Sequence, residues 1–189
     1  FERSWCFRST TGFTALGLQK ARAGRNPPPI TGIVFPVGDD MAAFDAREVG
    51  YTRHRVDTSR LTVLDYGCDD PRIDSKGCER LRELLKAPSS EYRVWIYVPD
   101  ETHAADETYP ICQTYVDVVL SGCLEWGGER FAKELVLSTT GWSDCFLNDA
   151  PLSRRPWLHR KQYQAIDKVL EEHNDLTFFS ERKHPEEFA

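Results

Sequence analysis

Two hydrophobic periodicities divide this chain. In the first hundred residues, apolar and polar positions mostly alternate, and β-branched and aromatic residues are frequent, which is typical of β-strands. A turn rich in Ser, Thr and Gly separates the first two alternating runs, and a glycine- and proline-rich loop precedes the third. We therefore predict six strands, at residues 2–8, 13–18, 30–37, 51–57, 61–65 and 93–98.

The second half has the period of helices. Pro110 stands where a helix tolerates proline, and Gly127-Gly128 predicts the end of that helix. Its apolar face, which we expect in the core, is formed at helical spacing by Ile111, Tyr115, Val118, Val119, Gly122 and Trp126. Further helices are expected at about 129–137 and 158–173, with a short one before Gly50 and a helical excursion at 78–86. We interpret residues 1–173 as one domain, 66–90 as a surface insertion and 174–189 as a charged tail.

Composition narrows the functional classes. The chain has 189 residues, 40% of them hydrophobic, and a net charge of −6 with no basic block, which argues against nucleic-acid binding. No apolar run approaches the roughly 18 residues that a membrane-spanning helix needs. The first residue is Phe1, so we expect a processed or partial chain that works inside the cell, in the cytoplasm or in an organelle after loss of a targeting segment.

The six cysteines contain no C-x-x-C pair, so we expect no metal site. Cys112 and Cys123 share a predicted helix, in which eleven residues span about 16 Å, far beyond disulfide reach. Cys68 and Cys78 flank a polar loop and either pair or remain thiols, thiols being the ordinary state inside cells. The five histidines stand in polar settings, and we expect them to be solvated.

One carboxylate occupies an unusual place in the pattern. Val37, Met41, Phe44 and Glu48 fall on one apolar stripe of the predicted short helix, so Glu48 stands where a core residue is expected. Burial and the negative end of the helix dipole would both raise the pKa of such a carboxyl, which suits a general base near neutral pH. The alternative is that Glu48 reaches solvent past a frayed helix end.

Two segments resemble a known family. Val-Phe-Pro-Val at 34–37 and Phe-Asp-Ala-Arg-Glu-Val-Gly-Tyr at 44–51 are similar to the γ-glutamylcyclotransferase-like family, in which a strand leads to a short helix ending in D-x-x-E-G-x-x-Y. Here Val49 stands where the family has glycine, and Gly50 follows. The resemblance covers roughly residues 1–140 and is specific only around Glu48.

This resemblance implies an α+β fold, with a small, mostly antiparallel, barrel-like sheet and helices packed outside. It implies that Glu48 is the catalytic base and that Tyr51 and Tyr115 bind substrate, although each tyrosine also fits a packing role. The implied reaction cyclises a γ-glutamyl amine to 5-oxoproline and releases the amine, with no metal or organic cofactor.

The family's Y-G-S-[NL] turn, whose backbone amides hold the substrate, has no match in this chain. Losing one oxyanion donor typically costs about 10²–10³ in rate, and here the whole donor set is missing, so we expect that the chain alone does not cyclise γ-glutamyl amides at a useful rate. The alternative is a non-catalytic accessory subunit that docks to a protein partner in a larger assembly. A third possibility, regulation through binding of a γ-glutamyl metabolite, is not separated from the first by the sequence.

Overall fold

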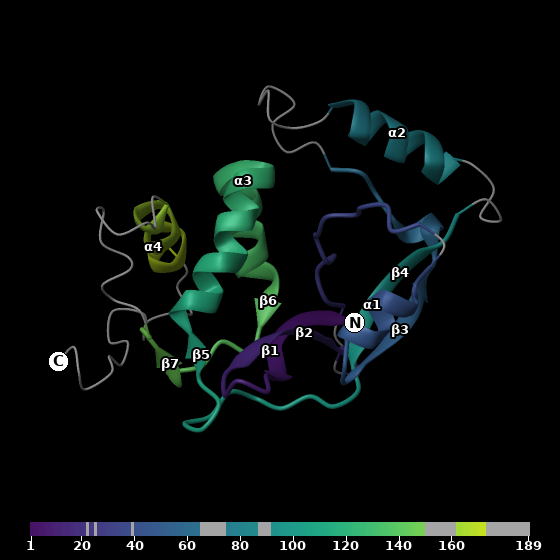
Figure 1. The fold of residues 1–189 in the computed structure, drawn as a ribbon. Coiled ribbons are helices and arrows are strands. Elements are labelled where there is room, and N and C mark those ends of the chain that lie inside the picture. Colours follow the sequence, from purple (N-terminus) through teal and green to yellow (C-terminus); the bar gives the residue numbers. More distant parts are fainter. Residues whose placement is uncertain are drawn as a thin grey trace. The chain divides into compact units, whose positions relative to one another are not determined.

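The computed structural model describes residues 1–21, 23–24, 26–38, 40–64, 75–86, 92–149 and 162–172. Contacts group the chain into two compact units (Figure 1). The first unit comprises Phe1–Gly32 and Glu101–Ala189, and the second comprises Ile33–Asp100. That both belong to one domain spanning residues 1–173 stays a prediction. No helix in these described ranges has the length and apolar character to cross a membrane.

A three-stranded sheet forms the base of the first unit. The strands β1 (Glu2–Arg8) and β2 (Thr14–Gln19) pair antiparallel, and β6 (Thr139–Thr140) joins the other edge of β1 in parallel. The first two strands are joined by the predicted turn, in which the Ser9 amide donates to the Phe13 carbonyl at 2.8 Å. Because β1 is central in this sheet, its first five residues are all buried, polar ones included.

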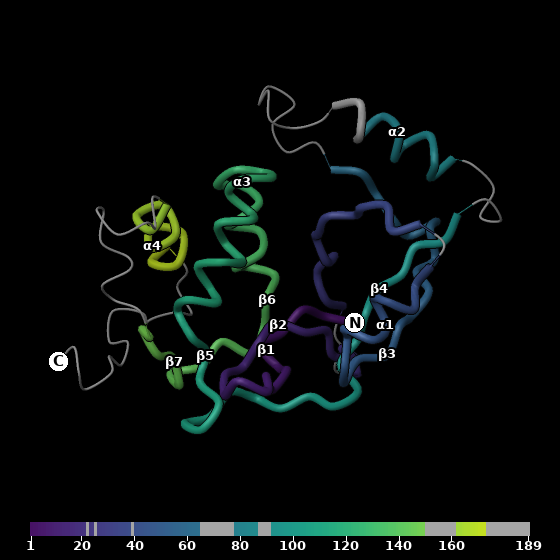
Figure 2. Tube along the Cα trace, viewed as in Figure 1, coloured from purple at the N-terminus to yellow at the C-terminus, as the bar shows by residue number. Residues whose placement is uncertain are grey.

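Two helices pack together above this sheet. The long helix α3 (Gln113–Ser138) follows the short strand β5 (Ile111–Cys112), which pairs in parallel with β7 (Phe146–Leu147). The helix α4 (Tyr163–Glu171) lies alongside α3, as both ribbon and tube show (Figures 1 and 2). Gly128 has a φ of 62° and breaks α3 into two parts, which confirms the predicted end of one helix and start of the next.

The buried face of α3 differs from the predicted one. Val118 and Trp126, both expected in the core, are more than half exposed. The buried face instead includes Gln113 and Asp117, at 0% and 1% exposure, and the Gln113 amide donates to the Asp117 carboxylate at 2.7 Å. Two polar residues that form a hydrogen bond with each other can be buried. The hydrophobic pattern therefore predicts the wrong face of α3 to be buried. The buried residues of α3 are Gln113, Val116, Asp117, Leu120, Cys123, Leu124, Gly127, Phe131, Ala132, Leu135 and Val136.

The second unit is built on a two-stranded antiparallel sheet. The strand β3 (Tyr51–Val56) pairs with β4 (Val94–Pro99), and the short helix α1 (Ala42–Arg47) precedes β3. A 3₁₀ turn, η1 (Thr58–Arg60), follows β3. The helix α2 (Ser75–Lys86) includes the helical segment predicted at 78–86. The side chain of Asp57 caps η1, because its carboxylate accepts from the Ser59 amide at 3.0 Å.

The α+β class is confirmed, whereas the described residues contain no closed barrel. The strands predicted at 30–37 and at 61–64 are wrong, because the structure pairs neither segment with another strand. Apolar residues favour a strand only where a partner strand covers them, and Pro36 withholds a backbone donor. Asp65, Cys68, residues 66–74 and 87–90 of the predicted insertion, the start of the last predicted helix and the tail at 174–189 lie outside the described residues.

Candidate functional site

Glu48 stands at the junction between α1 and β3. The backbone of α1 ends at Arg47, and Glu48 is its C-cap, with φ −86° and ψ 54° and an amide that donates to the Phe44 carbonyl at 3.0 Å. Gly50 then takes a φ of 84°, a left-handed conformation that glycine adopts without strain, and Tyr51 opens β3. The helix, glutamate, glycine turn and strand therefore follow one another in the order that the sequence predicts.

The surroundings of Glu48 differ from the expected core position. Its side chain is 28% exposed, and its Oε1 accepts from the Arg47 guanidinium at 3.3 Å. No residue of α1 is buried, and Val37 lies outside this helix of six residues, so the predicted core position of Glu48 is wrong. Val37, Met41, Phe44 and Glu48 are nevertheless each half-buried, whereas the other described residues of 37–48 are exposed, so the predicted stripe does mark the less exposed positions. Glu48 is half-buried, and its Oε2 accepts no hydrogen bond from a described residue.

A polar cluster joins α1 to the sheet of the second unit. Arg53 and Tyr97 are directly opposite each other on β3 and β4. The Tyr97 hydroxyl donates to Asp45 Oδ1 at 2.8 Å, and the Arg53 guanidinium lies 3.4 Å from Asp45 Oδ2. The Arg53 guanidinium also stacks 4.7 Å above the centre of the Trp95 ring, a cation–π contact. Asp45 thus fixes α1, and with it Glu48, against one face of the sheet.

Glu48 acts electrostatically on this cluster. The pKa of Tyr97 is raised, first by loss of hydration and then by the hydrogen bond to the Asp45 carboxylate and by the negative charges of Asp45 and Glu48. The Glu48 carboxylate therefore lies within electrostatic reach of the Tyr97 hydroxyl. The hydrophobic pattern gives no signal for the cluster of Asp45, Arg53 and Tyr97, since only the strand register shows which side chains face each other.

The two predicted substrate-binding tyrosines lie in different units. Tyr51 begins β3, three residues after Glu48, and is half-buried. Tyr115 belongs to α3 of the first unit, where its ring packs against Phe13 and Trp5 with centroid distances of 5.1 and 5.9 Å. Burial raises the pKa of Tyr115, and a backbone hydrogen bond with Leu16 opposes that rise. These contacts favour the packing role for Tyr115, and its role toward substrate stays a prediction.

The described cysteines are free thiols. Cys112 immediately precedes α3 and Cys123 lies within it, so the prediction that these two remain unlinked is confirmed. Cys78 is also free. Burial raises the pKa of Cys6, Cys112 and Cys123 to about 11 in each case. Across the ranges that the structure describes, no three His, Cys, Asp or Glu side chains are grouped so that they could hold a metal ion.

No protein-family model, no curated protein and no solved structure matches the chain. The role of Glu48 therefore rests on its own surroundings and on the resemblance of residues 34–51.

Proposed function

We propose that the chain supports a γ-glutamylcyclotransferase-like reaction in which Glu48 is the general base. The observation that carries this proposal is the position of Glu48 at the α1–β3 junction, with a half-buried carboxylate whose Oε2 accepts no hydrogen bond from a described residue. A carboxylate fixed at the end of an element, yet open at one oxygen, can accept a proton from a bound ligand. The resemblance of residues 44–51 to the family motif supports the same role.

The proposed reaction is an intramolecular aminolysis. Glu48 takes one proton from the α-ammonium of a γ-glutamyl amine, and the freed amine attacks the γ-carbonyl carbon. A new C–N bond closes the five-membered ring, and the original amide C–N bond breaks. The proton held by Glu48 passes to the departing nitrogen, and the ring nitrogen then gives its second proton to the released amine, so that 5-oxoproline and the protonated amine are the products. Because both reacting groups belong to one molecule, the attack needs no second reactant to be positioned.

Neighbouring residues take supporting roles. Arg47 holds Oε1 of Glu48 and so directs Oε2 toward a ligand. Asp45 is a positioning residue, because its contacts with Tyr97 and Arg53 fix α1 to the sheet. Tyr51, which opens β3 after the Gly50 turn, is the proposed substrate contact in this unit, and Tyr115 is a further proposed substrate contact.

The test is release of 5-oxoproline from glutathione and from γ-glutamyl-alanine. The chain is incubated with each substrate, and 5-oxoproline and glutamate are separated and measured, with protein-free samples giving the spontaneous rate. We expect slow release of 5-oxoproline that Glu48→Gln removes. Glu79→Gln, on the exposed side of α2, changes an equivalent carboxylate in the same unit and should leave the rate unchanged.

The second candidate is the non-catalytic accessory subunit, which a different observation favours. The unpaired segment 30–37 exposes Ile33, Val34 and Phe35, at 48%, 51% and 62%. Exposed neighbouring apolar residues are typical of protein-binding surfaces. Such a segment would suit a protein partner that presents an apolar strand edge. Equal 5-oxoproline release with wild type, Glu48→Gln and no protein would contradict the enzyme proposal and favour this candidate.

A further inference from the structure

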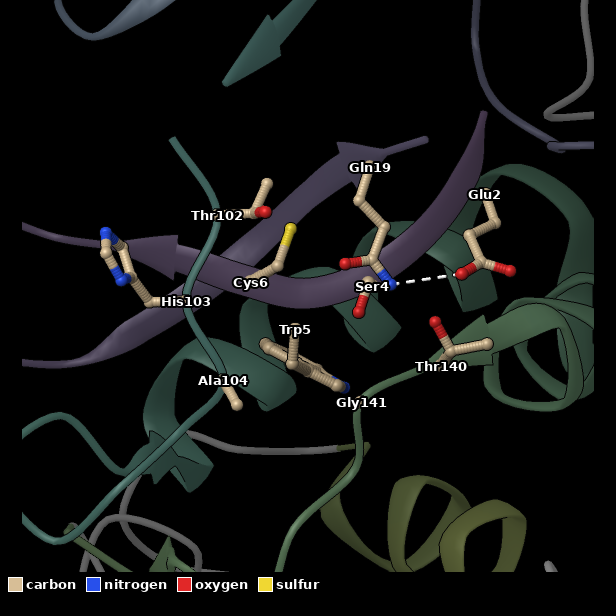
Figure 3. Close-up of a pocket in the computed structure, with 10 residues that line it drawn as sticks. All are labelled: Glu2, Ser4, Trp5, Cys6, Gln19, Thr102, His103, Ala104, Thr140 and Gly141. Atoms are coloured by element: carbon tan, nitrogen blue, oxygen red, sulfur yellow. Dashed lines mark hydrogen bonds between the residues drawn. The ribbon is translucent and has the colours of Figure 1, made fainter. Parts of the chain in front are cut away.

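A cavity of about 310 Å³ lies within the first unit, and no residue of the proposed Glu48 site lines it (Figure 3). Its walls come from β1, from the last residue of β2, and from the segments 102–104 and 140–141. A backbone hydrogen bond joins segment 102–104 to β1, because the His103 amide donates to the Cys6 carbonyl at 2.8 Å. The cavity is therefore built by elements of one unit.

An acidic side chain forms one end of this cavity. Glu2 is only 3% exposed, and its Oε1 accepts from Gln19 Nε2 at 3.1 Å, as Figure 3 shows. Among the residues that the structure describes, no Lys, Arg or His forms an ion pair with Glu2. A buried carboxylate is costly unless a positive charge and hydrogen bonds compensate it. A neutral amide supplies only part of that compensation, so the site suits a cationic ligand.

Two hydroxyl groups lie at the same end of the cavity as the Glu2 carboxylate (Figure 3). Ser4 is 2% exposed, and Thr140 Oγ1 donates to the Arg3 carbonyl at 3.1 Å, which leaves its lone pairs able to accept. Gly141 has a φ of 76°, and a Cβ there would come within 2.6 Å of Ser4 Oγ. The absence of a side chain at Gly141 therefore keeps the Ser4 hydroxyl uncovered.

The remaining wall combines apolar and polar residues. Trp5, Cys6 and Ala104 line it together with Thr102 and His103, and burial keeps Cys6 as a neutral thiol because its pKa is raised to about 11. A water molecule occupies roughly 30 Å³ of liquid, so the cavity is much larger than a bare metal ion requires. An aliphatic stem would fill the space beside these residues.

We propose that this cavity binds a small primary alkylammonium ligand, with Glu2 as its counter-ion. A primary ammonium has three N–H donors, which match the Glu2 carboxylate and the hydroxyls of Ser4 and Thr140. This inference goes beyond the proposed reaction and does not depend on it, because no residue of the Glu48 site contributes to the cavity.

The experiment is isothermal titration calorimetry of the chain with n-butylammonium chloride. Its neutral comparator is n-butanol, which has nearly the same shape and no charge. We expect n-butylammonium to bind at least tenfold more tightly than n-butanol, and Glu2→Gln to weaken ammonium binding at least tenfold. Glu125→Gln, on the exposed side of α3, is the matched control and should bind as the wild type does.

Thr140→Val keeps the side-chain shape and removes one acceptor, so it should weaken binding severalfold even if Glu2→Gln fails to fold. Circular dichroism of each variant checks folding. No measurable binding of n-butylammonium to the wild type, or equal affinity for the ammonium and the alcohol, would overturn the proposal. Displacement of n-butylammonium by KCl, but not by NaCl at the same ionic strength, would also overturn it in favour of an inorganic cation site.

Discussion

Replacement of Gly141 by alanine tests the packing that shapes the cavity of the first unit. Gly141 has a φ of 76°, and a Cβ there would lie 2.6 Å from Ser4 Oγ and 3.0 Å from the Trp5 carbonyl oxygen. A left-handed conformation costs a non-glycine residue about 1–2 kcal/mol, and overpacking a well-packed site costs about 1–3 kcal/mol. The two together lower the free energy of unfolding by about 2–5 kcal/mol.

Gly12 provides the matched control. It has a φ of 88° in the β1–β2 turn, but a Cβ there would meet no atom within 4 Å. Gly12→Ala should therefore show only the backbone cost, about 1–2 kcal/mol. Urea denaturation followed by tryptophan fluorescence measures both variants. A Gly141→Ala variant that is no less stable than Gly12→Ala would refute the close packing of residues 140–141 against β1.

Three further predictions concern the titrating side chains and the helix pair. Alkylation by iodoacetamide at pH 8 should be slow at Cys6, Cys112 and Cys123 and faster in urea, because burial raises the pKa of each to about 11; equal rates with and without urea would contradict this. Spectrophotometric titration should show Tyr97 ionising above pH 10. Because its pKa is higher in the folded chain, its contribution to stability is complete below pH 10 and is lost as the pH rises through the folded pKa, and Tyr97→Phe should remove that loss. Ile166→Ala on α4, at a position 1% exposed, should lower the free energy of unfolding by about 2–5 kcal/mol, whereas the exposed control Gln164→Ala should change it little.

The elements that the sequence predicts correctly are those fixed by nearby residues. Alternation and a short turn suffice for β1 and β2, and the Gly127-Gly128 pair suffices for the break in α3. The segment at 30–37 shows the limit of this reasoning, because an apolar run becomes a strand only if another strand pairs with it. Similarly, Gln113 and Asp117 are buried because they bond to each other, which hydrophobic periodicity does not register.

In the candidate site, too, the sequence predicts the features that nearby residues fix but not those that depend on distant contacts. The order of helix, Glu48, glycine turn and strand is local and follows from the motif. The half-burial of Glu48 does not follow from the motif, because it depends on α1 ending at Arg47. The cluster of Asp45, Arg53 and Tyr97 depends on the register of β3 against β4, which brings Arg53 opposite Tyr97. Hydrophobic periodicity cannot show that two residues 44 positions apart lie opposite each other.

In the proposed reaction, Glu48 acts as the base of the cyclisation. The most direct test is the ratio of kcat/KM for 5-oxoproline release from γ-glutamyl-alanine between the wild-type chain and Glu48→Gln. Positioned general bases typically contribute about 10²–10⁴ in rate, so we predict a ratio in that range, with the two proteins equal in thermal stability. A ratio near one, with 5-oxoproline released above the protein-free rate, would contradict the role of Glu48 and place the base elsewhere.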